Sequence, residues 1–494
     1  MASHTIPKLK NPELLQEYSF INGEFVKAKS GKTFDVFDPA TGSKIASPPE
    51  MSLDELKQAI EAAHDALAVL KKTTGRQRAR WLRKWYDLMI ENQEDLATIL
   101  TWENGKVLAD SHGEIAYSAG FFEWFSEEAP RIYGDTIPSA VPGRRMYTIK
   151  QPVGVCGIIT PWNFPSGMIT RKVGAALAAG CPVVVKPAAE TPFSALALAY
   201  LAQKAGIPAG VVNVVTADKG TIDFGRELCE NPIVKKVSFT GSTRVGKILM
   251  GQSANTLKKL SLELGGNAPY IVFEDGDIDA AITSALAAKY RGNGQVCVSP
   301  NRFYVHEKIY DEFCSKITAK VSSIYKPGAG FNPDVNLGPL INDAAVKKVK
   351  SHVEDVVAKN GKILTGGEPL PGLGPNFFPA TVVSDVTKDM LINHEETFGP
   401  LVSIIKFSGE EDVIAKANNV LVGLASYFFT KDVGRAYRVA EALETGMVGV
   451  NTGLISEQAL PFGGVKESGF GREGSKYGVE EYLTIKTVVV DATV

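Results

Sequence analysis

The chain has 494 residues, which is more than one compact core usually contains, so its length predicts two or three domains. Apolar residues make up 44% and charged residues 22%, the formal net charge is −2, and like charges do not gather in blocks. This composition is ordinary for a soluble globular protein and argues against a nucleic acid or a membrane as a partner bound through a basic face.

Signals for targeting and for metal binding are also missing. No apolar run approaches the ~20 residues that cross a bilayer. The N-terminal MASHTIPKLKNPELL has neither the apolar core of a secretory signal nor the arginines of a transit peptide. The five cysteines have unrelated spacings without a CxxC pair, and the six histidines form no HxH or HxxxH pattern. We therefore expect a cytoplasmic protein with no disulfide framework and no bound metal.

The N-terminal part predicts helices. Apolar residues recur at steps of four and three between 56 and 70, which predicts an amphipathic helix over 53–72. Ser52 and Glu55 have the spacing of a capping box at its start. A second helical block, rich in Arg, Trp and Leu, is expected from about 76 to 101.

From residue 153 the pattern alternates between strands and helices. The apolar, β-branched runs are VGVCGIIT, CPVVVKP, VVNVVT and VKKVSFTG, and helical stretches such as MITRKVGAALAAG and TPFSALALAYLAQKAG lie between them. Thr191 is expected to cap the second of these helices, with Pro192 at its first position. The alternation predicts βαβ units in an open α/β sheet, which binds ligands beyond the carboxyl ends of its strands. The loops ITPWNFP, VKPAAETP and FTGSTRVG fall at those ends.

Two further regions complete the organisation. A second α/β region is expected over about 265–465, beginning with the strand APYIVFED and a helix over 279–290. The stretch 134–151 and the C-terminal TIKTVVVD are both strand-like. They are candidates to pair in an extra sheet, whose edges would accept a neighbouring subunit.

Cys297 lies in GNGQVCVSPNR, an unusual setting for a structural cysteine. Buried structural cysteines are normally surrounded by apolar side chains, whereas the glycines at 292 and 294 allow a tight backbone bend or a close approach to a ligand. The local sequence leaves two interpretations open, a bystander thiol in a turn or a nucleophile at the tip of a loop.

Three other polar residues have two interpretations each. Glu263 lies between leucines at the end of an apolar strand, which suits a general base or a glutamate on the outer face of a strand. Asn163 in TPWNFP can donate to an oxyanion or cap a turn. Lys186, at the end of CPVVVKP, can hold a ribose hydroxyl or a phosphate, or be a surface lysine. Likewise, FTGSTRVG is either a phosphate-binding helix start or a Gly-Ser turn.

Six motifs, taken together, carry a family resemblance. ITPWNFP, FTGSTRVG, LELGGNAP, GQVCVSPNR, EETFGP and PFGGVKESGFGRE occur in this order and resemble the aldehyde dehydrogenase superfamily from about residue 18 to the end. The resemblance implies an α/β fold with a Rossmann-type cofactor domain, an α/β catalytic domain and a small β oligomerisation element that builds a homodimer or homotetramer. The implied ranges are 1–133 and 154–264 for NAD(P) binding, 265–465 for catalysis, and 134–153 and 466–494 for oligomerisation and bridging.

The resemblance also implies roles for individual residues. Cys297 matches the nucleophile, Asn163 and the backbone N–H of Cys297 would hold the oxyanion, and Glu263 would activate the hydrolytic water. Glu396 and Phe398 match the residues that contact the ribose and the nicotinamide. The full implied cofactor set is Thr160, Pro161, Trp162, Lys186, Pro187, Ala188, Ala189, Phe239, Gly241, Ser242, Gly246, Glu396 and Phe398.

Three residues resemble one branch of the family more closely. Arg171, Arg291 and Ser456 match the carboxylate-binding positions of succinate-semialdehyde dehydrogenases. Arginine offers fixed, bidentate donors for a carboxylate. The resemblance thus implies oxidation of succinic semialdehyde to succinate, as in 4-aminobutyrate degradation. Glutarate semialdehyde and general aliphatic aldehydes stay open as alternative substrates.

The cofactor and one departure from the branch follow from single positions. NAD-preferring relatives often have a glutamate where this chain has Ala189, and a small neutral residue leaves room for a 2′-phosphate beside Lys186. We therefore expect NADP to be accepted, alongside NAD. Many relatives in this branch read CVC at the nucleophile, whereas Ser299 stands at the second position here, so a local disulfide with Cys297 is not expected.

Two other classes of protein are weaker alternatives. A cysteine hydrolase or acyltransferase would use Cys297 and Glu263 without nicotinamide, but neither residue has a histidine near it in the sequence. A non-catalytic nucleotide-binding protein on the same fold would not need the intact set of Asn163, Glu263 and Cys297.

Overall fold

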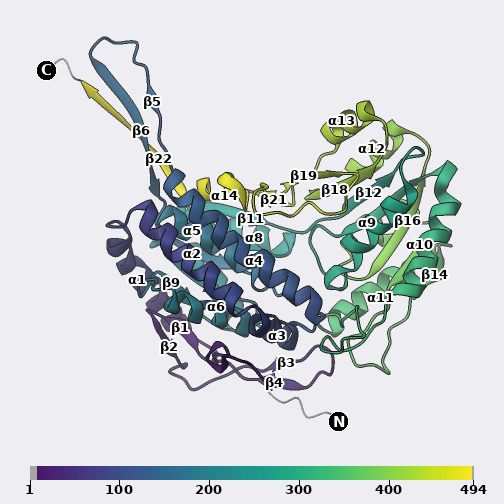
Figure 1. Cartoon of the computed structure of the whole chain (residues 1–494), viewed down its shortest axis with the longest axis horizontal. Helices are drawn as coiled ribbons and strands as arrows, with labels where there is room; N and C mark the ends of the chain where they lie inside the picture. The colour runs from purple at the N-terminus through teal and green to yellow at the C-terminus, as the bar shows by residue number, and fades with distance from the viewer. Residues whose placement is uncertain (1–7, 492–494) are drawn as a thin grey trace.

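The computed structural model of the chain describes residues 8–491, which form two α/β lobes and a β arm that projects from the first lobe (Figure 1). Residues 1–7 begin the segment predicted to lack a targeting signal, and residues 492–494 end the predicted oligomerisation segment; both lie outside the described residues. No helix within 8–491 is long and apolar enough to cross a membrane.

The first lobe is built on an eight-stranded sheet in the order β2-β1-β9-β8-β7-β10-β11-β21. Its five central strands are parallel, and the strands at its edges pair antiparallel, as expected for an open α/β sheet. The strands are β1 (Ser19–Ile21), β2 (Glu24–Val26), β7 (Val155–Ile159), β8 (Val183–Lys186), β9 (Val212–Val214), β10 (Val234–Thr240), β11 (Lys259–Glu263) and β21 (Gly469–Phe470).

Helices cover both faces of this sheet because its strands are apolar on both sides. In β8, Val183 and Val185 pack into one core with helices α2 to α6, while Val184 packs into the opposite core with α1, α7 and α8. The helices are α1 (Leu53–Leu70), α2 (Gly75–Glu91), α3 (Gln93–Asn104), α4 (Leu108–Glu128), α5 (Gly167–Ala179), α6 (Pro192–Lys204), α7 (Thr221–Glu230) and α8 (Thr243–Ser253).

The predicted helices of this lobe are confirmed with one exception. The capping box of Ser52 and Glu55 opens α1, and the Ser52 N–H donates to the Glu55 carboxylate at 2.7 Å. The block expected over 76–101 is two helices, α2 and α3, because Asn92 between them has φ −106° and ψ 20°, outside the helical region.

The start of α6 also differs from the expected one. The Thr191 hydroxyl makes no capping hydrogen bond, because its backbone (φ −137°, ψ 61°) is not extended as in a typical N-cap. Instead the Glu103 carboxyl, from the end of α3, accepts the backbone N–H groups of Phe193 at 2.7 Å and Ser194 at 2.8 Å. Burial raises the pKa of Glu103 to about 8.

The second lobe contains a seven-stranded sheet in the order β14-β15-β16-β13-β12-β18-β19. All neighbouring strands are parallel except β14 and β15, which confirms the second α/β region. The strands are β12 (Ala268–Val272), β13 (Pro300–His306), β14 (Lys362–Thr365), β15 (Thr381–Ser384), β16 (Leu401–Phe407), β18 (Ala425–Phe429) and β19 (Met447–Val450). The helices are α9 (Ile278–Tyr290), α10 (Tyr310–Ile324), α11 (Asp343–Ala358), α12 (Glu410–Asn418) and α13 (Val433–Ala442).

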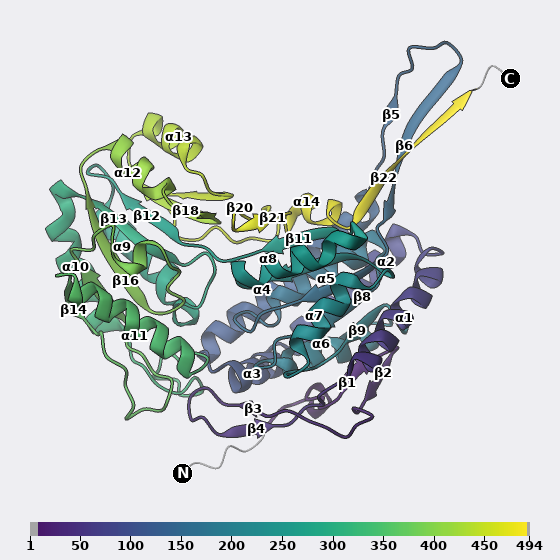
Figure 2. The same ribbon diagram turned by 180° about the vertical axis from the view of Figure 1, so that it is seen from behind.

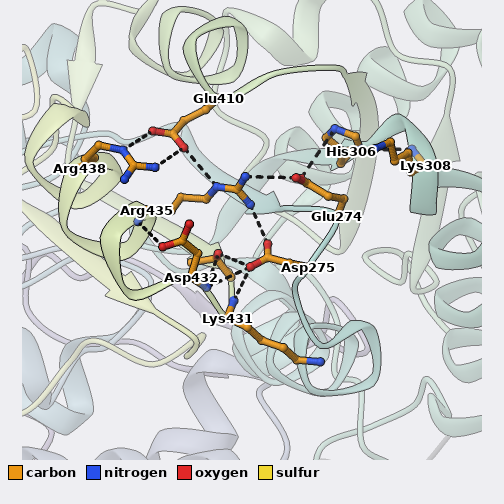
Figure 3. A network of polar contacts seen from close by, with 10 residues as sticks. Glu274, Asp275, His306, Lys308, Glu410, Lys431, Asp432, Arg435 and Arg438 are labelled. Carbon is orange, nitrogen blue, oxygen red and sulfur yellow. Dashed lines mark hydrogen bonds and ion pairs between the residues drawn. The ribbon is translucent and has the colours of Figure 1, made fainter.

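A polar network ties the helices at one end of this lobe to the sheet (Figure 3). Arg435 of α13 pairs with Asp275 at 2.7 Å, with Glu274 at 3.1 Å and with Glu410 at 3.1 Å. Its guanidinium also lies 4.4 Å above the Phe273 ring. All five N–H donors of an arginine can be used in such a fork, so this one side chain fixes α12 and α13 against the end of β12.

The arm consists of β5 (Thr136–Ile137), β6 (Arg144–Pro152) and β22 (Leu483–Asp491), with β6 in the middle. β22 pairs antiparallel with β6 along its whole length, from Leu483 opposite Pro152 to Asp491 opposite Arg144. The predicted pairing of the two distant strand-like segments is therefore confirmed. In both views the arm points away from the two lobes (Figures 1 and 2).

The C-terminal segment 466–482 lies in the body of the protein and not in the arm. β20 (Val465–Lys466) pairs with β17 (Val422–Gly423) of the second lobe, and β21 then joins the first sheet beside β11. α14 (Ser475–Glu480) packs on the first lobe before the chain enters the arm (Figure 2). A small hairpin of β3 (Val36–Phe37) and β4 (Lys44–Ala46) completes the elements.

Candidate active site

Cys297 lies in the loop between α9 and β13, and this loop explains the glycines around it. Gly292, Asn293 and Gly294 have φ values of 55°, 57° and 72° in succession, a left-handed run that side chains with a Cβ rarely adopt. A Cβ on Gly294 would also collide with the carbonyl oxygen of Gly399. The glycines are therefore needed to bring Cys297 to the boundary between the two lobes.

Two cavities meet at the Cys297 side chain, and both are lined by residues from each lobe. The first has a volume of about 180 Å³, and the second about 230 Å³. Because drug-sized ligands occupy about 300–1,000 Å³, the first cavity suits a small substrate. It is lined by Lys106, Tyr117, Phe164, Arg171, Arg291, Ser456, Phe462 and neighbouring residues. The second is lined by Pro161, Trp162, Asn163, Thr240, Gly241, Ser242, Leu264, Gly265, Glu396 and Phe398.

The structure thus brings together the three predicted catalytic residues, the three predicted carboxylate-binding residues and six of the predicted cofactor residues. The other predicted cofactor residues lie outside the lining of both cavities. They are Thr160, Lys186, Pro187, Ala188, Ala189, Phe239 and Gly246, all on β8, β10, α8 or the loops that follow β7 and β8.

The second cavity has the features of a dinucleotide site. It opens beyond the carboxyl end of β10, where α8 begins with its free N–H groups and Ser242 as N-cap. Gly241 leaves room for the Phe239 ring, and a Cβ on Gly246 would come within 2.5 Å of Leu264. These glycines allow backbone to approach a phosphate closely, so the site fits a nicotinamide dinucleotide.

Lys186 and Glu396 are the two charged residues among the predicted cofactor residues. Lys186 is buried at the end of β8, and burial lowers its pKa to about 8. None of the ion pairs among the described residues includes it, so its ammonium is available to a ribose or phosphate. Burial raises the pKa of Glu396 to about 7, and this carboxyl accepts the Gly266 N–H at 3.2 Å. Phe398 meets Trp162 edge to face at 5.6 Å.

The Cys297 thiol donates to Oε1 of Glu263 at 3.2 Å. Burial raises the pKa of this thiol well above its usual value, and the Glu263 charge adds to the effect, while Arg171 opposes it. The thiol is therefore protonated in this form of the protein, with the carboxylate already placed to accept its proton.

The other oxygen of Glu263 joins a buried chain of polar groups. Oε2 accepts the Thr240 hydroxyl at 3.0 Å, and that hydroxyl accepts from the Lys172 ammonium at 2.6 Å. Lys172 and Arg171 both pair with Glu473, and Arg171 also pairs with Oε2 of Glu263. Because the Lys172 ammonium donates to Thr240 and the Thr240 hydroxyl donates to Oε2, this chain fixes the orientation of the Glu263 carboxylate.

Sequence reasoning missed three members of this chain, namely Thr240, Lys172 and Glu473. Every residue of α5 is buried, so two adjacent cations at 171 and 172 must have buried partners. The sequence MITRKVGAALAAG carries that signal, because the two cations stand in an otherwise apolar helix. Glu473 lies in the quoted motif PFGGVKESGFGRE, yet the local sequence does not indicate which cation it meets.

Asn163 is held by a second buried network. Its side-chain amide donates to the Gln295 carbonyl at 3.0 Å, which leaves one N–H of the amide for a substrate oxygen. Its backbone carbonyl accepts from Lys106 at 2.7 Å, and Lys106 pairs with Glu114 at 2.6 Å. Glu114 also accepts the Ser166 N–H at 3.0 Å, near the start of α5. Nothing in the sequence around Lys106 and Glu114 indicates this role.

The two predicted anchor arginines have different environments. Arg171 is only 3% exposed and is ion-paired with Glu263 and Glu473, which hold its pKa above the ordinary value despite burial. Arg291 lies in the same cavity with its guanidinium 5.7 Å from the Phe164 ring, and its Nε has no hydrogen-bond partner among the described residues. Arg291 is thus the cation of this cavity that is available to a substrate carboxylate.

Across residues 8–491, no cluster of three or more His, Cys, Asp or Glu side chains has the arrangement of a metal site.

The chain is similar to known proteins in both sequence and structure. Residues 25–488 match the aldehyde dehydrogenase family. The chain is 56% identical to the NADP(+) succinate-semialdehyde dehydrogenase 1 of Schizosaccharomyces pombe, over 96% of this chain and 94% of that protein. It is 54% identical to a glutarate-semialdehyde dehydrogenase of Pseudomonas aeruginosa, over 97% and 98% of the two chains. The crystal structure of succinate-semialdehyde dehydrogenase from Burkholderia pseudomallei superposes with a TM-score of 0.96 at 54% identity, over 98% of this chain and 100% of that one. The chain belongs to the aldehyde dehydrogenase family.

Proposed function

We propose that this chain is a succinate-semialdehyde dehydrogenase that oxidises succinic semialdehyde to succinate with NADP or NAD. The observation that carries the proposal is the meeting of two cavities at Cys297, one suited to a dinucleotide and one with an unpaired arginine, Arg291. A small cavity with a cation opposite the thiol fits a short aldehyde with a carboxylate at its far end. The names of the yeast and Burkholderia relatives support the same substrate.

The reaction begins at the thiol. Glu263 accepts the Cys297 proton across the 3.2 Å hydrogen bond, and the sulfur adds to the aldehyde carbon. The free N–H of the Asn163 amide and the backbone N–H of Cys297 stabilise the oxyanion of the thiohemiacetal. A bound nicotinamide, held by Trp162, Glu396 and Phe398 beside Cys297, would supply the hydride acceptor for this carbon, and loss of the hydride would leave a thioester on Cys297.

Hydrolysis completes the cycle. Glu263 takes a proton from a water molecule, which adds to the thioester carbon and releases the acid and the Cys297 thiolate. Glu263 must give up its proton to solvent after each of the two transfers, because the Lys172 ammonium donates to Thr240 and the Thr240 hydroxyl donates to Oε2, so these two bonds orient the carboxylate and do not accept a proton from it. Thr240, Lys172 and Glu473 therefore act through Glu263 and do not touch the substrate.

The cofactor assignment rests on the end of β8. Ala189 follows Lys186 by three residues, and its small side chain would leave room for a 2′-phosphate near the buried ammonium of Lys186, which would supply the opposite charge. The name of the yeast relative, which states NADP(+), agrees with this arrangement. Glu190 lies near enough to Lys186 to affect its charge, which leaves NAD acceptable as well.

Glutarate semialdehyde is the second candidate substrate. The Pseudomonas aeruginosa relative named for it is 54% identical to this chain. The two aldehydes differ by one methylene, which a hydrophobic pocket distinguishes by only about 1–3 kcal/mol. The same anchor and the same nucleophile serve both.

The division of the chain and its assembly are part of the proposal. The first sheet binds the cofactor, the second lobe supplies the nucleophile, and the arm forms a homodimer or homotetramer. β6 and β22 leave an exposed apolar face that consists of Tyr147, Ile149 and Val490, with Val488 between them. Exposed apolar faces and free strand edges of this kind are typical of subunit contacts. All five cysteines are free, which suits the cytoplasm.

The test is the initial rate of reduced-cofactor formation with succinic semialdehyde and with butanal, each with NADP and with NAD. We expect kcat/KM for succinic semialdehyde to exceed that for butanal by at least about tenfold, because a charge-assisted pair to Arg291 is worth roughly 1.5–3 kcal/mol. Arg291→Met should abolish most of that preference while butanal turnover persists. Equal kcat/KM values for the two aldehydes in the unmodified protein would remove the carboxylate anchor from the account.

A further inference from the structure

Arg171 is shared between the substrate cavity and the proposed general base, Glu263. It lines the substrate cavity together with Arg291, Ser456 and Cys297. At the same time its guanidinium holds Oε2 of Glu263, the carboxylate whose other oxygen faces the thiol. A substrate carboxylate that reaches Arg171 must therefore compete with the general base for the same cation.

The other contacts of the Arg171 guanidinium are fixed, so only its bond to Glu263 can be exchanged for a bond to the substrate. The Nε side of Arg171 pairs with Glu473, which is also bound to Lys172. The Phe462 ring lies 4.5 Å below the guanidinium carbon. These contacts hold the arginine in place whichever carboxylate it binds on its cavity side.

We propose that the carboxylate of the substrate displaces Glu263 from Arg171 and so releases the base that activates Cys297. The proposal rests on the proposed function, since it requires a substrate with a carboxylate. In the free protein the Arg171 guanidinium and the Thr240 hydroxyl both bind Oε2 of Glu263. When the guanidinium N–H bonds to the substrate instead, the Glu263 carboxylate is held by Thr240 alone, with its other oxygen still facing the thiol.

The proton transfer from Cys297 to Glu263 needs no further reactant. One S–H bond of Cys297 breaks and one O–H bond forms at Oε1 of Glu263, and no electron is transferred. Arg171 keeps its charge and exchanges one carboxylate for another. The Thr240 hydroxyl stays bonded to Oε2 of Glu263, so the released carboxylate keeps its orientation.

This role differs measurably from that of a simple anchor. An anchor that binds the ground state and the transition state equally lowers KM and leaves kcat unchanged. A carboxylate that also releases the base must raise kcat. Succinic semialdehyde should therefore exceed butanal in kcat as well as in affinity.

The decisive experiment supplies the aldehyde group and the carboxylate group of the substrate as two separate molecules. Turnover of saturating acetaldehyde with NADP is measured against increasing sodium acetate, with sodium chloride at equal ionic strength as the control. Acetate provides the carboxylate at Arg171 and Arg291 without covering the thiol. We expect kcat for acetaldehyde to rise saturably, on the order of tenfold, as is usual for coupling between two sites.

Two variants test which arginine is responsible for the activation by acetate. Arg291→Met should raise the acetate concentration needed for half of the activation and leave its maximum in place. Arg171→Gln should show no rise of kcat with acetate, whatever its rate without acetate, because it has no guanidinium to exchange between carboxylates. If Arg171→Gln does not fold, the acetate series on the unmodified protein still decides.

The outcomes separate this inference from the proposed function. If acetate only inhibits or has no effect, and succinic semialdehyde is preferred over butanal in KM alone, Arg171 is an anchor and the release of Glu263 is refuted. If succinic semialdehyde is not preferred in either constant, the proposed substrate is wrong as well.

Discussion

At the scale of single residues, the environment of Cys297 opposes the thiolate. The side chain is half-buried, and the carboxylate of Glu263 lies 3.2 Å from its sulfur. Both factors disfavour a second negative charge at this place. We therefore expect the free protein to hold Cys297 as a neutral thiol, which reacts slowly with oxidants and alkylating reagents.

This environment predicts a pH dependence for alkylation of Cys297 by iodoacetamide in the cofactor-free protein. A free thiol has a pKa of about 8.5, and only the thiolate reacts. Because burial and Glu263 raise the pKa of Cys297 well above the ordinary value, its alkylation should be slow at pH 8 and still rising beyond pH 9. Peptide mass spectrometry separates it from Cys314, whose pKa burial raises to about 11. A rate for Cys297 that levels off below pH 8 would contradict this explanation.

Which residues of the site could be predicted depends on where their partners lie. The resemblance of six motifs was enough to select Cys297, Glu263 and Asn163, and the structure brings these three together. Lys172 and Glu473 pair across 301 residues of sequence, and such a pairing leaves no local pattern. The bond between Arg171 and Glu263 joins a predicted anchor to a predicted base, and no spacing in the sequence indicates it.

At the scale of elements, strand and helix positions followed from apolar periodicity, and a helix end followed only where its cap is local, as in the capping box of α1. The alternation after residue 153 predicts the order of β7 to β10 and of α5 and α6 correctly. The cap of α6 was assigned to Thr191 because the hydroxyl precedes a proline, but a carboxyl from α3 takes that place. Long-range partners compete with local caps, and sequence alone shows only the local one.

The α6 cap gives a matched pair of stability predictions. Glu103→Ala removes the acceptor of two buried N–H groups, and each group left without a partner costs about 1–3 kcal/mol, so the melting temperature should fall by several degrees. Thr191→Val should leave the melting temperature unchanged or raise it slightly, because the buried hydroxyl of Thr191 has no partner among the described residues. Differential scanning calorimetry measures both. A larger loss for Thr191→Val than for Glu103→Ala would restore the hydroxyl as the cap.

At the scale of the whole molecule, the candidate site lies between the two lobes. Glu263 ends β11 of the first sheet and Cys297 lies in a loop of the second lobe, so the proposed reaction requires the two lobes to keep their relative position. Segment 466–482 runs between the lobes, because β20 pairs with β17 and β21 pairs with β11 (β20, β21 and β11 are labelled in Figure 2). The sequence suggested a bridging role for this segment, but its division between two sheets depends on antiparallel pairing with distant strands.

The arm predicts assembly through its apolar face. Tyr147 and Val490 lie on that face, and placing charges there by Tyr147→Asp together with Val490→Asp should convert the oligomer to a monomer. Phe37→Asp together with Ile363→Asp, which places two charges at exposed apolar positions outside the arm, is the matched control and should leave the oligomer intact. Sedimentation velocity distinguishes the species. An unchanged sedimentation coefficient in the double variant would exclude the arm face as the subunit contact.

If the aldehyde is oxidised while it is bound to Cys297, the acylated protein can be trapped. Glu263→Gln removes the proposed base of both steps, but the thiol can still lose its proton slowly to solvent, whereas hydrolysis of the thioester lacks an activated water. Mixing this variant with succinic semialdehyde and NADP should therefore produce NADPH slowly, up to one equivalent, and then stop. After an acid quench, mass spectrometry should find a succinyl group on the peptide that contains Cys297, and Cys297→Ala should yield neither NADPH nor the adduct. NADPH formation by Glu263→Gln without a succinyl group on Cys297, or by Cys297→Ala, would contradict the account.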